Sequence, residues 1–241
     1  MKDFSSLGLA DPLLHALEDA GYNAPTPIQT EAIPLILDSH DLLGIAQTGT
    51  GKTAAFALPI LDRLAAQRRR PPTKGCRALV LAPTRELASQ IAESFRVYGR
   101  HLGLEVVTVF GGVSPRAQSR ALSRGIDILV ATPGRLIDHM STGVADLGRT
   151  EILVLDEADQ MLDLGFAPAL RRIVAALPKE RQTLFFSATM PDAVSSLASA
   201  FLNKPKRVSV TPVGTPAARV SQRVIHVAGA QKRAVLSGLL A

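Results

Sequence analysis

The sequence has one cysteine, no acidic residue near its end and no long hydrophobic run. Because Cys76 stands alone, an internal disulfide and a multi-cysteine metal site are both excluded, as is typical of a protein from a reducing compartment. The five histidines are scattered without the spacing of a metal-ligand set. The apolar runs are too short to span a membrane, and Met1-Lys2-Asp3-Phe4 starts no signal peptide. We therefore expect a cytoplasmic protein with no membrane partner.

The charge of the chain is unevenly distributed. Residues 1–192 carry 20 Lys and Arg against 21 Asp and Glu, whereas the residues after Asp192 carry seven Lys and Arg and no acid. The body is close to neutral and the end is basic, so the net charge of +6 does not by itself indicate a nucleic-acid-binding protein. With 241 residues, 46% of them hydrophobic, the chain can bury the core of one large domain, or of one domain and a fragment.

A glycine-containing loop lies between an apolar run, residues 42–45, and a helical pattern, residues 54–66. The loop consists of Ala46, Gln47, Thr48, Gly49, Thr50, Gly51, Lys52 and Thr53. Its glycines leave backbone N–H groups open to a phosphate chain, Lys52 supplies a cation and Thr53 supplies a hydroxyl ligand for Mg²⁺. A turn without a ligand can have this composition, and Ala46 replaces the first glycine of the general pattern. Gly-Lys-Thr between a strand and a helix nevertheless predicts nucleotide binding.

Beyond this loop, short β-rich runs alternate with helical patterns. The β-rich runs are residues 78–82, 106–110, 128–131, 152–155, 184–186 and 207–210. The helical patterns include residues 86–102, 116–123 and 168–177. This alternation predicts an α/β fold with a mostly parallel sheet and helices on both faces. In such a sheet, ligands bind beyond the carboxyl ends of the strands.

One strand end carries an acidic group. The run at residues 152–155 is followed by Asp156-Glu157-Ala158-Asp159. A carboxylate at the tip of a buried strand beside the glycine loop can hold Mg²⁺ directly or through water, which is the role predicted for Asp156. Glu157 can orient or deprotonate the attacking water. A solvated acidic turn is the alternative, but its position after a buried strand favours the metal site.

Three further strand ends carry hydroxyls, glycines or arginines. They are Pro83-Thr84-Arg85, Thr132-Pro133-Gly134-Arg135 and Ser187-Ala188-Thr189. Each alone is compatible with a helix cap. Hydroxyls, free N–H groups and an arginine at the start of a helix are also what binding to a phosphodiester requires.

The first forty residues predict two short helices. Asp11 as N-cap, Pro12 at the first helical position and Gly21 at the end indicate the first helix, and a second pattern runs from Ile28 to Leu37. The Gln29 amide can donate to and accept from an adenine edge, and Tyr22 can stack on the ring.

Together, these motifs resemble the N-terminal RecA-like domain of the DEAD-box ATP-dependent RNA helicases, over about residues 4–210. The residues that carry the resemblance stand in the order of the family. They are Phe4, the Q motif ending at Gln29, the loop 46–53, residues 83–88, Gly111-Gly112, residues 132–135, Asp156 to Asp159, and Ser187 to Thr189. Ala46 at the start of the loop also matches this family.

The resemblance implies a role for each motif. ATP would be bound by the loop 46–53 and by the Q-motif residues Phe4, Tyr22 and Gln29. Lys52, Asp156 and Glu157 would be catalytic, with Thr53 and Asp156 on Mg²⁺. Asp159, Ser187 and Thr189 would couple the nucleotide state to domain closure. The residues that would contact the RNA backbone without reading its bases are Pro83, Thr84, Arg85, Gly111, Gly112, Thr132, Pro133, Gly134 and Arg135.

The family also implies a second RecA-like domain, which supplies arginine fingers and the other half of the RNA groove. We expect the first domain at residues 1–210, a linker at 211–219, and the start of a truncated second domain at 220–241, with a strand at 220–227 and a helix at 231–240. Two functions stay open: the catalytic half of an RNA helicase, or a nucleotide-binding module with little turnover of its own. A P-loop kinase or a RecA-type recombinase explains Gln29 and the Ser187–Thr189 motif less well.

Overall fold

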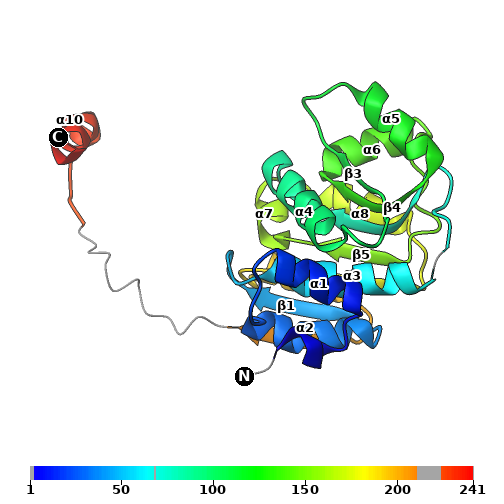
Figure 1. Ribbon diagram of the computed structural model, residues 1–241. Coiled ribbons are helices and arrows are strands. Elements are labelled where there is room, and N and C mark those ends of the chain that lie inside the picture. Colours follow the sequence, from blue (N-terminus) through cyan, green and yellow to red (C-terminus); the bar gives the residue numbers. More distant parts are fainter. Residues whose placement is uncertain (1–2, 68, 211–223, 241) are drawn as a thin grey trace. The chain divides into compact units, whose positions relative to one another are not determined.

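The computed structural model describes residues 3–67, 69–210 and 224–240. The chain divides into two units, Met1–Thr211 and Pro212–Ala241 (Figure 1). In the part of the chain that is described, no helix is both long enough and apolar enough to cross a membrane.

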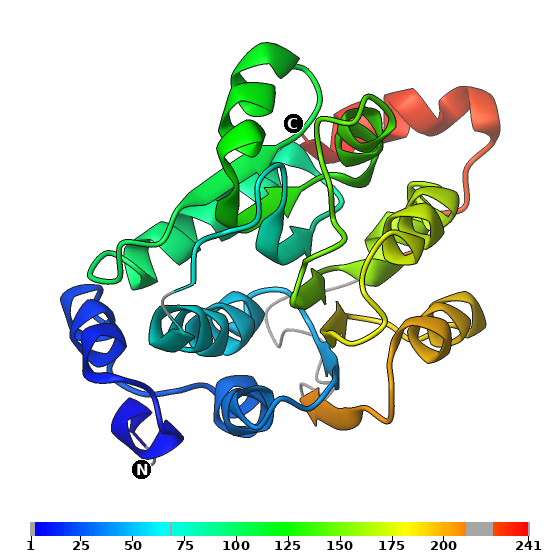
Figure 2. The ribbon, with the colours of Figure 1, turned by 90° about the vertical axis from the view of Figure 1, so that its right-hand side faces the viewer.

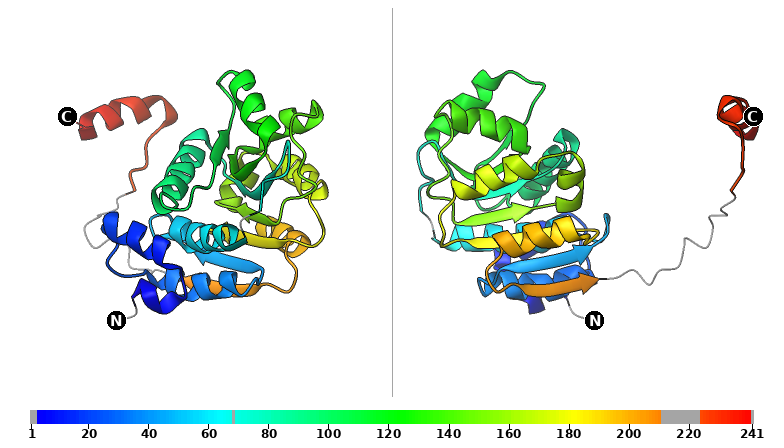
Figure 3. Two further views of the ribbon diagram at one scale, coloured as in Figure 1. Left: turned by 45° about the vertical axis from the view of Figure 1, so that its right-hand side comes forward. Right: turned by 180° about the vertical axis from the view of Figure 1, so that it is seen from behind.

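Seven strands of the described residues form one sheet, and each pair of neighbours runs parallel. They are β1 (Leu42–Ala46), β2 (Cys76–Leu81), β3 (Val106–Val109), β4 (Ile126–Ala131), β5 (Ile152–Leu155), β6 (Gln182–Ser187) and β7 (Lys206–Val210). Their order across the sheet is β3-β4-β2-β5-β6-β1-β7, and Figure 3 shows β7 next to β1 at one edge. The predicted parallel sheet is confirmed, with strand ends that differ by up to two residues from the sequence pattern.

Nine helices of the first unit accompany the sheet within the described residues. They are α1 (Asp11–Asp19), α2 (Pro27–Leu37), α3 (Lys52–Gln67), α4 (Arg85–Tyr98), α5 (Pro115–Arg124), α6 (Pro133–Ser141), α7 (Ala158–Asp163), α8 (Ala167–Ala175) and α9 (Asp192–Phe201), after a short 3-10 helix, η1 (Phe4–Leu7). Helices α6, α7 and α9 come in addition to those named from the sequence. The prediction of Asp11 as N-cap is wrong by one residue, because Ala10 has the extended backbone and Asp11 is already helical.

The two faces of the sheet are each covered by a separate hydrophobic cluster. Along β2, Ala78 and Val80 belong to the cluster that includes α1 to α4, whereas Leu79 and Leu81 belong to the cluster that includes α5 to α9. Successive strand residues point to opposite faces, so a strand buried on both faces is mostly apolar. Figure 2 shows α2 and α3 (blue and cyan) and α8 and α9 (yellow-green and gold) on opposite sides of the strands. The predicted helices on both faces are confirmed.

Three phenylalanines fix helix α3 under the glycine loop. Phe56 of α3 packs against Phe186 of β6, with 5.4 Å between ring centroids, and against Phe95 of α4 at 6.1 Å. Gly44 of β1 makes room for this contact, because a Cβ at that position would lie 2.5 Å from the Phe186 ring. The start of α3 is thereby held at the carboxyl end of β1.

The second unit contains η2 (Gly229–Gln231) and α10 (Lys232–Leu240). The helix predicted at residues 231–240 is confirmed. The strand predicted at 220–227 is wrong over residues 224–227, which have no regular structure; a strand requires a neighbour to which it can hydrogen-bond. Residues 220–223 and the predicted linker at 211–219 lie outside the described residues.

Candidate nucleotide and RNA sites

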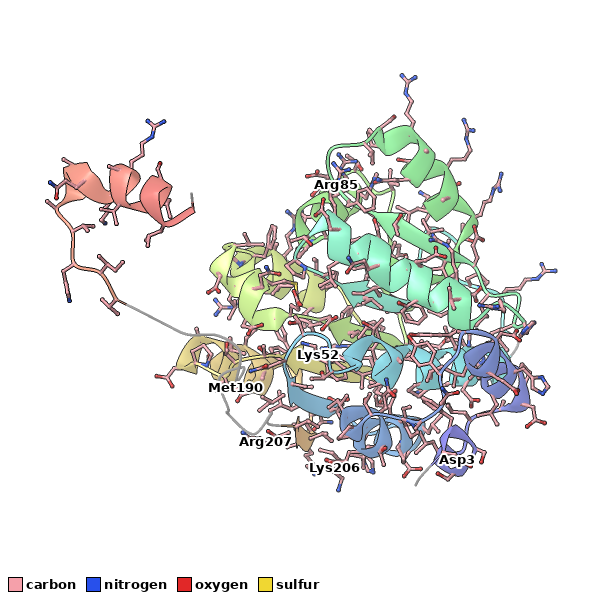
Figure 4. All side chains as sticks on the ribbon, turned by 60° about the vertical axis from the view of Figure 1, so that its left-hand side comes forward. Asp3, Lys52, Arg85, Met190, Lys206 and Arg207 are labelled. Atoms are coloured by element: carbon pink, nitrogen blue, oxygen red, sulfur yellow. The ribbon has the colours of Figure 1, made fainter. Side chains whose placement is uncertain are left out.

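The glycine loop joins the carboxyl end of β1 to the first turn of α3, where Figure 4 labels Lys52. Lys52 is 5% exposed, and its Nζ donates to the Ala46 carbonyl oxygen at 2.9 Å. The Thr50 hydroxyl donates to the Gln47 carbonyl oxygen at 2.7 Å. These bonds draw the loop around the lysine ammonium, whose two remaining protons are available to a phosphate.

Gln29 supports this loop from helix α2. Its Oε1 accepts from the Thr26 backbone N–H at 2.9 Å, and its Nε2 donates to the Gly51 carbonyl oxygen at 3.1 Å. The side chain is 1% exposed. The amide therefore retains one N–H and one oxygen lone pair, which are the two groups that an adenine edge would require.

We expect Gly51→Ala to destabilise the fold more than Gly49→Ala. Both glycines have a left-handed backbone, with φ of +92° and +79°, so each substitution costs about 1–2 kcal/mol. A Cβ at Gly51 would also lie 2.4 Å from Gln29 Nε2, whereas a Cβ at Gly49 would meet no atom within 4 Å. Denaturant unfolding of the two variants measures the difference. Equal losses of free energy of unfolding would contradict the Gln29 contact.

An aromatic wall lies beside the loop. The Tyr22 and Tyr98 hydroxyls are 2.8 Å apart, their rings meet edge to face at 5.6 Å, and Phe4 packs against the other side of Tyr22 at 6.5 Å. Phe4 is buried, whereas Tyr22 is 40% exposed. The sequence predicted Phe4 and Tyr22 for this site but not Tyr98, which occupies a buried position of an amphipathic helix and carries no local signal.

Asp156 and Glu157 follow β5. Asp156 is 2% exposed, and its burial raises the pKa of its carboxyl to about 6, although the Lys52 ammonium opposes this shift. The Glu157 backbone N–H donates to Asp156 Oδ1 at 3.0 Å. Glu157 itself has a left-handed backbone, with φ of 53°. Such strain in a residue other than glycine is characteristic of functional sites.

Most of these groups, but not Phe4 or Ala46, line one cavity of about 360 Å³. Its lining includes Tyr22, Gln29, Thr48, Gly49, Gly51, Lys52, Thr53, Leu87, Gln90, Ser94, Tyr98, Asp156 and Glu157. Larger cavities of about 650 and 470 Å³ lie at the amino ends of the strands, away from the glycine loop. The described residues contain no group of three or more His, Cys, Asp or Glu that could hold a metal. A Mg²⁺ ion at Asp156 and Thr53 would therefore take further ligands from phosphates and water, as this ion usually does.

Asp159 is bonded to the loop that follows β6. Asp159 Oδ2 accepts from the Thr189 N–H at 2.9 Å and from the Thr189 hydroxyl at 2.8 Å. The Ser187 hydroxyl donates to the Thr189 carbonyl oxygen at 2.7 Å. Burial of Asp159 raises its pKa, but the bonds from Thr189 outweigh this effect, and the net shift is downward. The three residues predicted to act in coupling thus form one connected set.

Arg85 lies at the start of α4 (Figure 4) and over the ring of Phe110, 5.3 Å from its centroid. Thr84 caps the helix, because its hydroxyl accepts from the Leu87 N–H at 3.2 Å. Gly112 has φ of +79°, and a Cβ there would lie 2.4 Å from the Arg85 guanidinium. Pro83 is buried and Gly111 is partly buried. Thr84, Arg85 and Gly112 therefore lie together.

Arg135 lies in the first turn of α6, after the N-cap Thr132. Its guanidinium donates to the Val113 carbonyl oxygen at 3.1 Å and to Gln118 Oε1 at 3.4 Å. Gln118 Oε1 is also 3.2 Å from His139 Nε2. Burial and the nearby Arg135 lower the pKa of His139. The sequence did not predict Gln118 or His139. Gln118 reaches Arg135 from helix α5, 17 residues earlier in the chain, and His139, one helical turn after Arg135 on α6, contacts Gln118.

The two remaining residues of this motif, Pro133 and Gly134, directly precede Arg135. Pro133 is buried in the first turn of α6, and Gly134 is exposed beside it. The exposed glycine leaves the backbone of this turn open to a ligand.

The two predicted sites both lie where the strands have their carboxyl ends, which we call the carboxyl edge of the sheet. The strand order places them at different positions along this edge. The glycine loop and the acidic pair of the nucleotide site follow β1 and β5, and the coupling residues lie after β5 and at the end of β6; these three strands are neighbours. The predicted RNA residues follow β2, β3 and β4, which are also neighbours. Because all seven strands are parallel, both sets lie at the same edge.

A parallel sheet with Gly-Lys-Thr after one strand and an acidic pair after another defines a P-loop domain of the RecA-like class. The sequence matches the DEAD/DEAH box helicase family over residues 26–197, and the chain belongs to this family. It is 46% identical over 234 residues to the ATP-dependent RNA helicase DeaD of Escherichia coli (strain K12), covering 97% of this chain and 36% of that protein. It is 45% identical to the RNA helicase CrhR of Synechocystis, covering 93% of this chain and 44% of that protein. The chain thus spans less than half the length of these relatives.

Two solved structures have the same fold. One is a DEAD box protein from Methanococcus jannaschii, with 33% identity and a TM-score of 0.79 over 99% of this chain and 63% of that one. The other is a hypothetical ATP-dependent RNA helicase from Sulfolobus tokodaii, with 36% identity and a TM-score of 0.77 over 84% of this chain and 57% of that one.

Proposed function

We propose that residues 1–210 are the ATP-binding and RNA-binding domain of a DEAD-box RNA helicase. In this proposal the domain requires a second RecA-like domain, connected through residues 211–219, for full ATP hydrolysis and for duplex separation. The main support is the division of the sheet edge, with phosphate-binding groups beyond β1 and β5 and backbone-binding groups beyond β2, β3 and β4. One domain can thereby hold a nucleotide and an RNA strand side by side.

The residues fit ATP and Mg²⁺. Gly49 and Gly51 leave the loop N–H groups open, and Lys52 has protons to spare for the β- and γ-phosphates. Thr53 and Asp156 would hold Mg²⁺, which neutralises developing charge on the phosphoryl oxygens. Glu157 would orient the attacking water and accept its proton.

The chain's own hydrogen bonds support a coupling role for Asp159. Its two bonds to Thr189 join the segment after β5, which carries Asp156 and Glu157, to the segment after β6. A change at the phosphate site would therefore reach a second loop at the same sheet edge.

We call the residues beyond β2, β3 and β4 the RNA half of the site. In this proposal its arginines contact the phosphates and sugars of the RNA. The Arg85 guanidinium is held over the Phe110 ring, and the Arg135 guanidinium is held by its hydrogen bond to the Val113 carbonyl oxygen. Because both side chains are already ordered, little side-chain entropy is lost on binding. None of the residues proposed to contact RNA is aromatic, so none of them offers a base-stacking platform, which favours recognition of the backbone over the sequence.

Titration with ADP, GDP and single-stranded RNA tests the proposal. We expect ADP to bind more tightly than GDP by about fivefold to a hundredfold, because guanine presents an acceptor to the Gln29 oxygen and about 1–3 kcal/mol is lost when a buried group is left unpaired. We expect RNA to bind with no preference for sequence. Equal affinities for ADP and GDP would contradict the role of Gln29, and absence of RNA binding would contradict the RNA half.

A further inference from the structure

Helix α5 carries a row of three arginines on its exposed side. Arg116, Arg120 and Arg124 are spaced by four residues and all are exposed, whereas Gln118 and Leu122 on the other side are buried. Residues four apart lie on one face of a helix. Between Glu105 and Asp127 these three arginines are the only charged residues. We call Arg116, Arg120 and Arg124 the arginine row.

The arginine row is unpaired. No guanidinium group of the row forms a hydrogen bond or an ion pair with any residue in the ranges 3–67, 69–210 and 224–240, whereas Arg77, Arg96, Arg100 and Arg135 are each paired with a carboxylate. Figure 4 shows long side chains with nitrogen tips directed outward from α5. Three guanidinium groups therefore present an anion-binding surface that no acid of the described fold neutralises.

The row begins at the proposed RNA half of the sheet edge. Helix α5 starts directly after the loop that contains Gly111 and Gly112, and Gln118 Nε2 anchors it by donating to the Phe110 carbonyl oxygen at 3.0 Å. The helix ends at Arg124, just before β4 starts at Ile126, so it leads away from the carboxyl edge. The eight residue steps from Arg116 to Arg124, at about 1.5 Å each, give the row a length of about 12 Å along the helix axis.

We propose that the arginine row binds the phosphodiester backbone of RNA that continues past the groove formed by Arg85 and Arg135. The exposed residues of α5 besides the arginines are Pro115, Ala117 and Ser123, which offer no large apolar side chain of the kind that anchors a protein partner. Binding of a flexible polyanion such as single-stranded RNA requires only positive charge on the protein surface. Guanidinium groups are well suited to phosphate. For a strand that keeps the helical rise of about 3.4 Å per nucleotide, the row covers three to four further nucleotides.

The experiment measures the affinity of the chain for a ladder of single-stranded oligouridylates, lengthened one nucleotide at a time. The variant is R116Q/R120Q/R124Q, since glutamine keeps helix propensity without charge. Once the RNA is long enough to fill the groove, we expect the affinity of the parent to keep increasing over about four more nucleotides. The affinity of the variant should stop increasing at a shorter RNA length. On the longest RNA the variant should bind about tenfold more weakly, with a salt slope reduced by about 2, at about 0.7 per phosphate.

Matched variants separate this inference from the proposed function on which it rests. R69Q/R70Q/K179Q removes three exposed charges near the amino ends of the strands and should leave the ladder unchanged. Arg135→Gln should weaken binding at every length, because it acts in the groove. A parent chain that binds no RNA would contradict the proposed function itself.

Two outcomes would overturn the inference while the proposed function stands. One is that the R116Q/R120Q/R124Q variant has the same affinity as the parent at every RNA length. The other is a loss of the same size at every length, which would indicate disturbance of the groove. Replacement of the three arginines by lysine should keep the salt slope, and a slope that fell with lysine would also overturn a role based on charge.

Discussion

Replacing Lys52 by alanine is expected to weaken binding of magnesium ADP by about ten- to a hundredfold, because a hydrogen bond to a charged group contributes about 1.5–3 kcal/mol. The ammonium has a second effect on Asp156. Burial raises the pKa of this carboxyl to about 6, and Lys52 opposes the shift. Without Lys52 the pKa rises further, so more of the carboxyl is protonated near neutral pH and fewer molecules can ligate Mg²⁺.

The pH dependence of the Lys52→Ala variant follows from this second effect. Its loss of affinity relative to the parent should be larger at about pH 6 than at about pH 8, because a rise in pH ionises Asp156 and so reduces the difference between the two proteins. Isothermal titration at the two pH values, with thermal unfolding as a check of the fold, makes the comparison. A loss that is independent of pH would contradict the coupling between Lys52 and Asp156.

Glu157→Gln serves as the matched comparison and should fail in a different way. The substitution keeps the shape of the side chain and the backbone N–H bond to Asp156, so nucleotide affinity should stay close to that of the parent. Hydrolysis, measured in a protein that also carries the second domain, should fall by about 10²–10⁴, the usual contribution of a general base. Hydrolysis at the parental rate would show that Glu157 does not act on the water.

The 241-residue chain alone is expected to bind ATP but to hydrolyse it slowly, with and without RNA. Within the ranges that the structure describes, Lys52 is the one cation that lines the nucleotide cavity, and no arginine reaches it. Phosphoryl transfer builds charge on the γ-phosphoryl oxygens, and an arginine finger contributes about 10³–10⁵ in rate to P-loop enzymes that use one. We therefore expect a deficit of that order relative to a protein with both domains.

A steady-state ATPase assay at saturating RNA, alongside a duplex-separation assay, measures this deficit. The comparison protein is the same sequence joined to a second RecA-like domain. RNA binding by the chain alone should also be weak and sensitive to salt, because only one side of the strand is contacted. Fast RNA-stimulated turnover or strand separation by the chain alone would contradict the prediction, and would require catalytic groups outside the described residues.

Local sequence was sufficient for the sheet and for the order of its motifs. The run at residues 152–155 matched β5 to the residue, because this strand is apolar over its whole length, as is common for a strand buried on both faces, and a charged residue follows it directly. The Gly-Lys-Thr loop was recognisable for a similar reason. Its glycine, lysine and threonine all act within one strand-to-helix junction. Residues that are neighbours in the sequence are therefore also neighbours in the site, and the motif can be recognised without knowledge of the fold.

Boundaries and supporting residues were predicted less well. Helix α3 begins at Lys52 and not at residue 54, because the glycine loop closes directly into the helix. The predicted strand at residues 224–227 has no regular structure, since strand propensity forms no strand without a hydrogen-bonding neighbour. Similarly, the sequence could not assign Gln118, whose bonds to Phe110, Arg135 and His139 depend on how β3, α5 and α6 pack.

The order of residues along the chain was enough to identify the chemical groups that stand at the ends of the strands, and therefore the class of site and the family. The tertiary structure alone decided how those groups are held. Tyr22 and Tyr98 are 76 residues apart and meet through their hydroxyls, and the Gln29 amide reaches Gly51 from another helix. The raised pKa of Asp156 likewise results from burial by segments far away in the chain. Such contacts depend on strand order, which hydrophobic periodicity does not encode, because every strand of a parallel sheet has a similar apolar pattern.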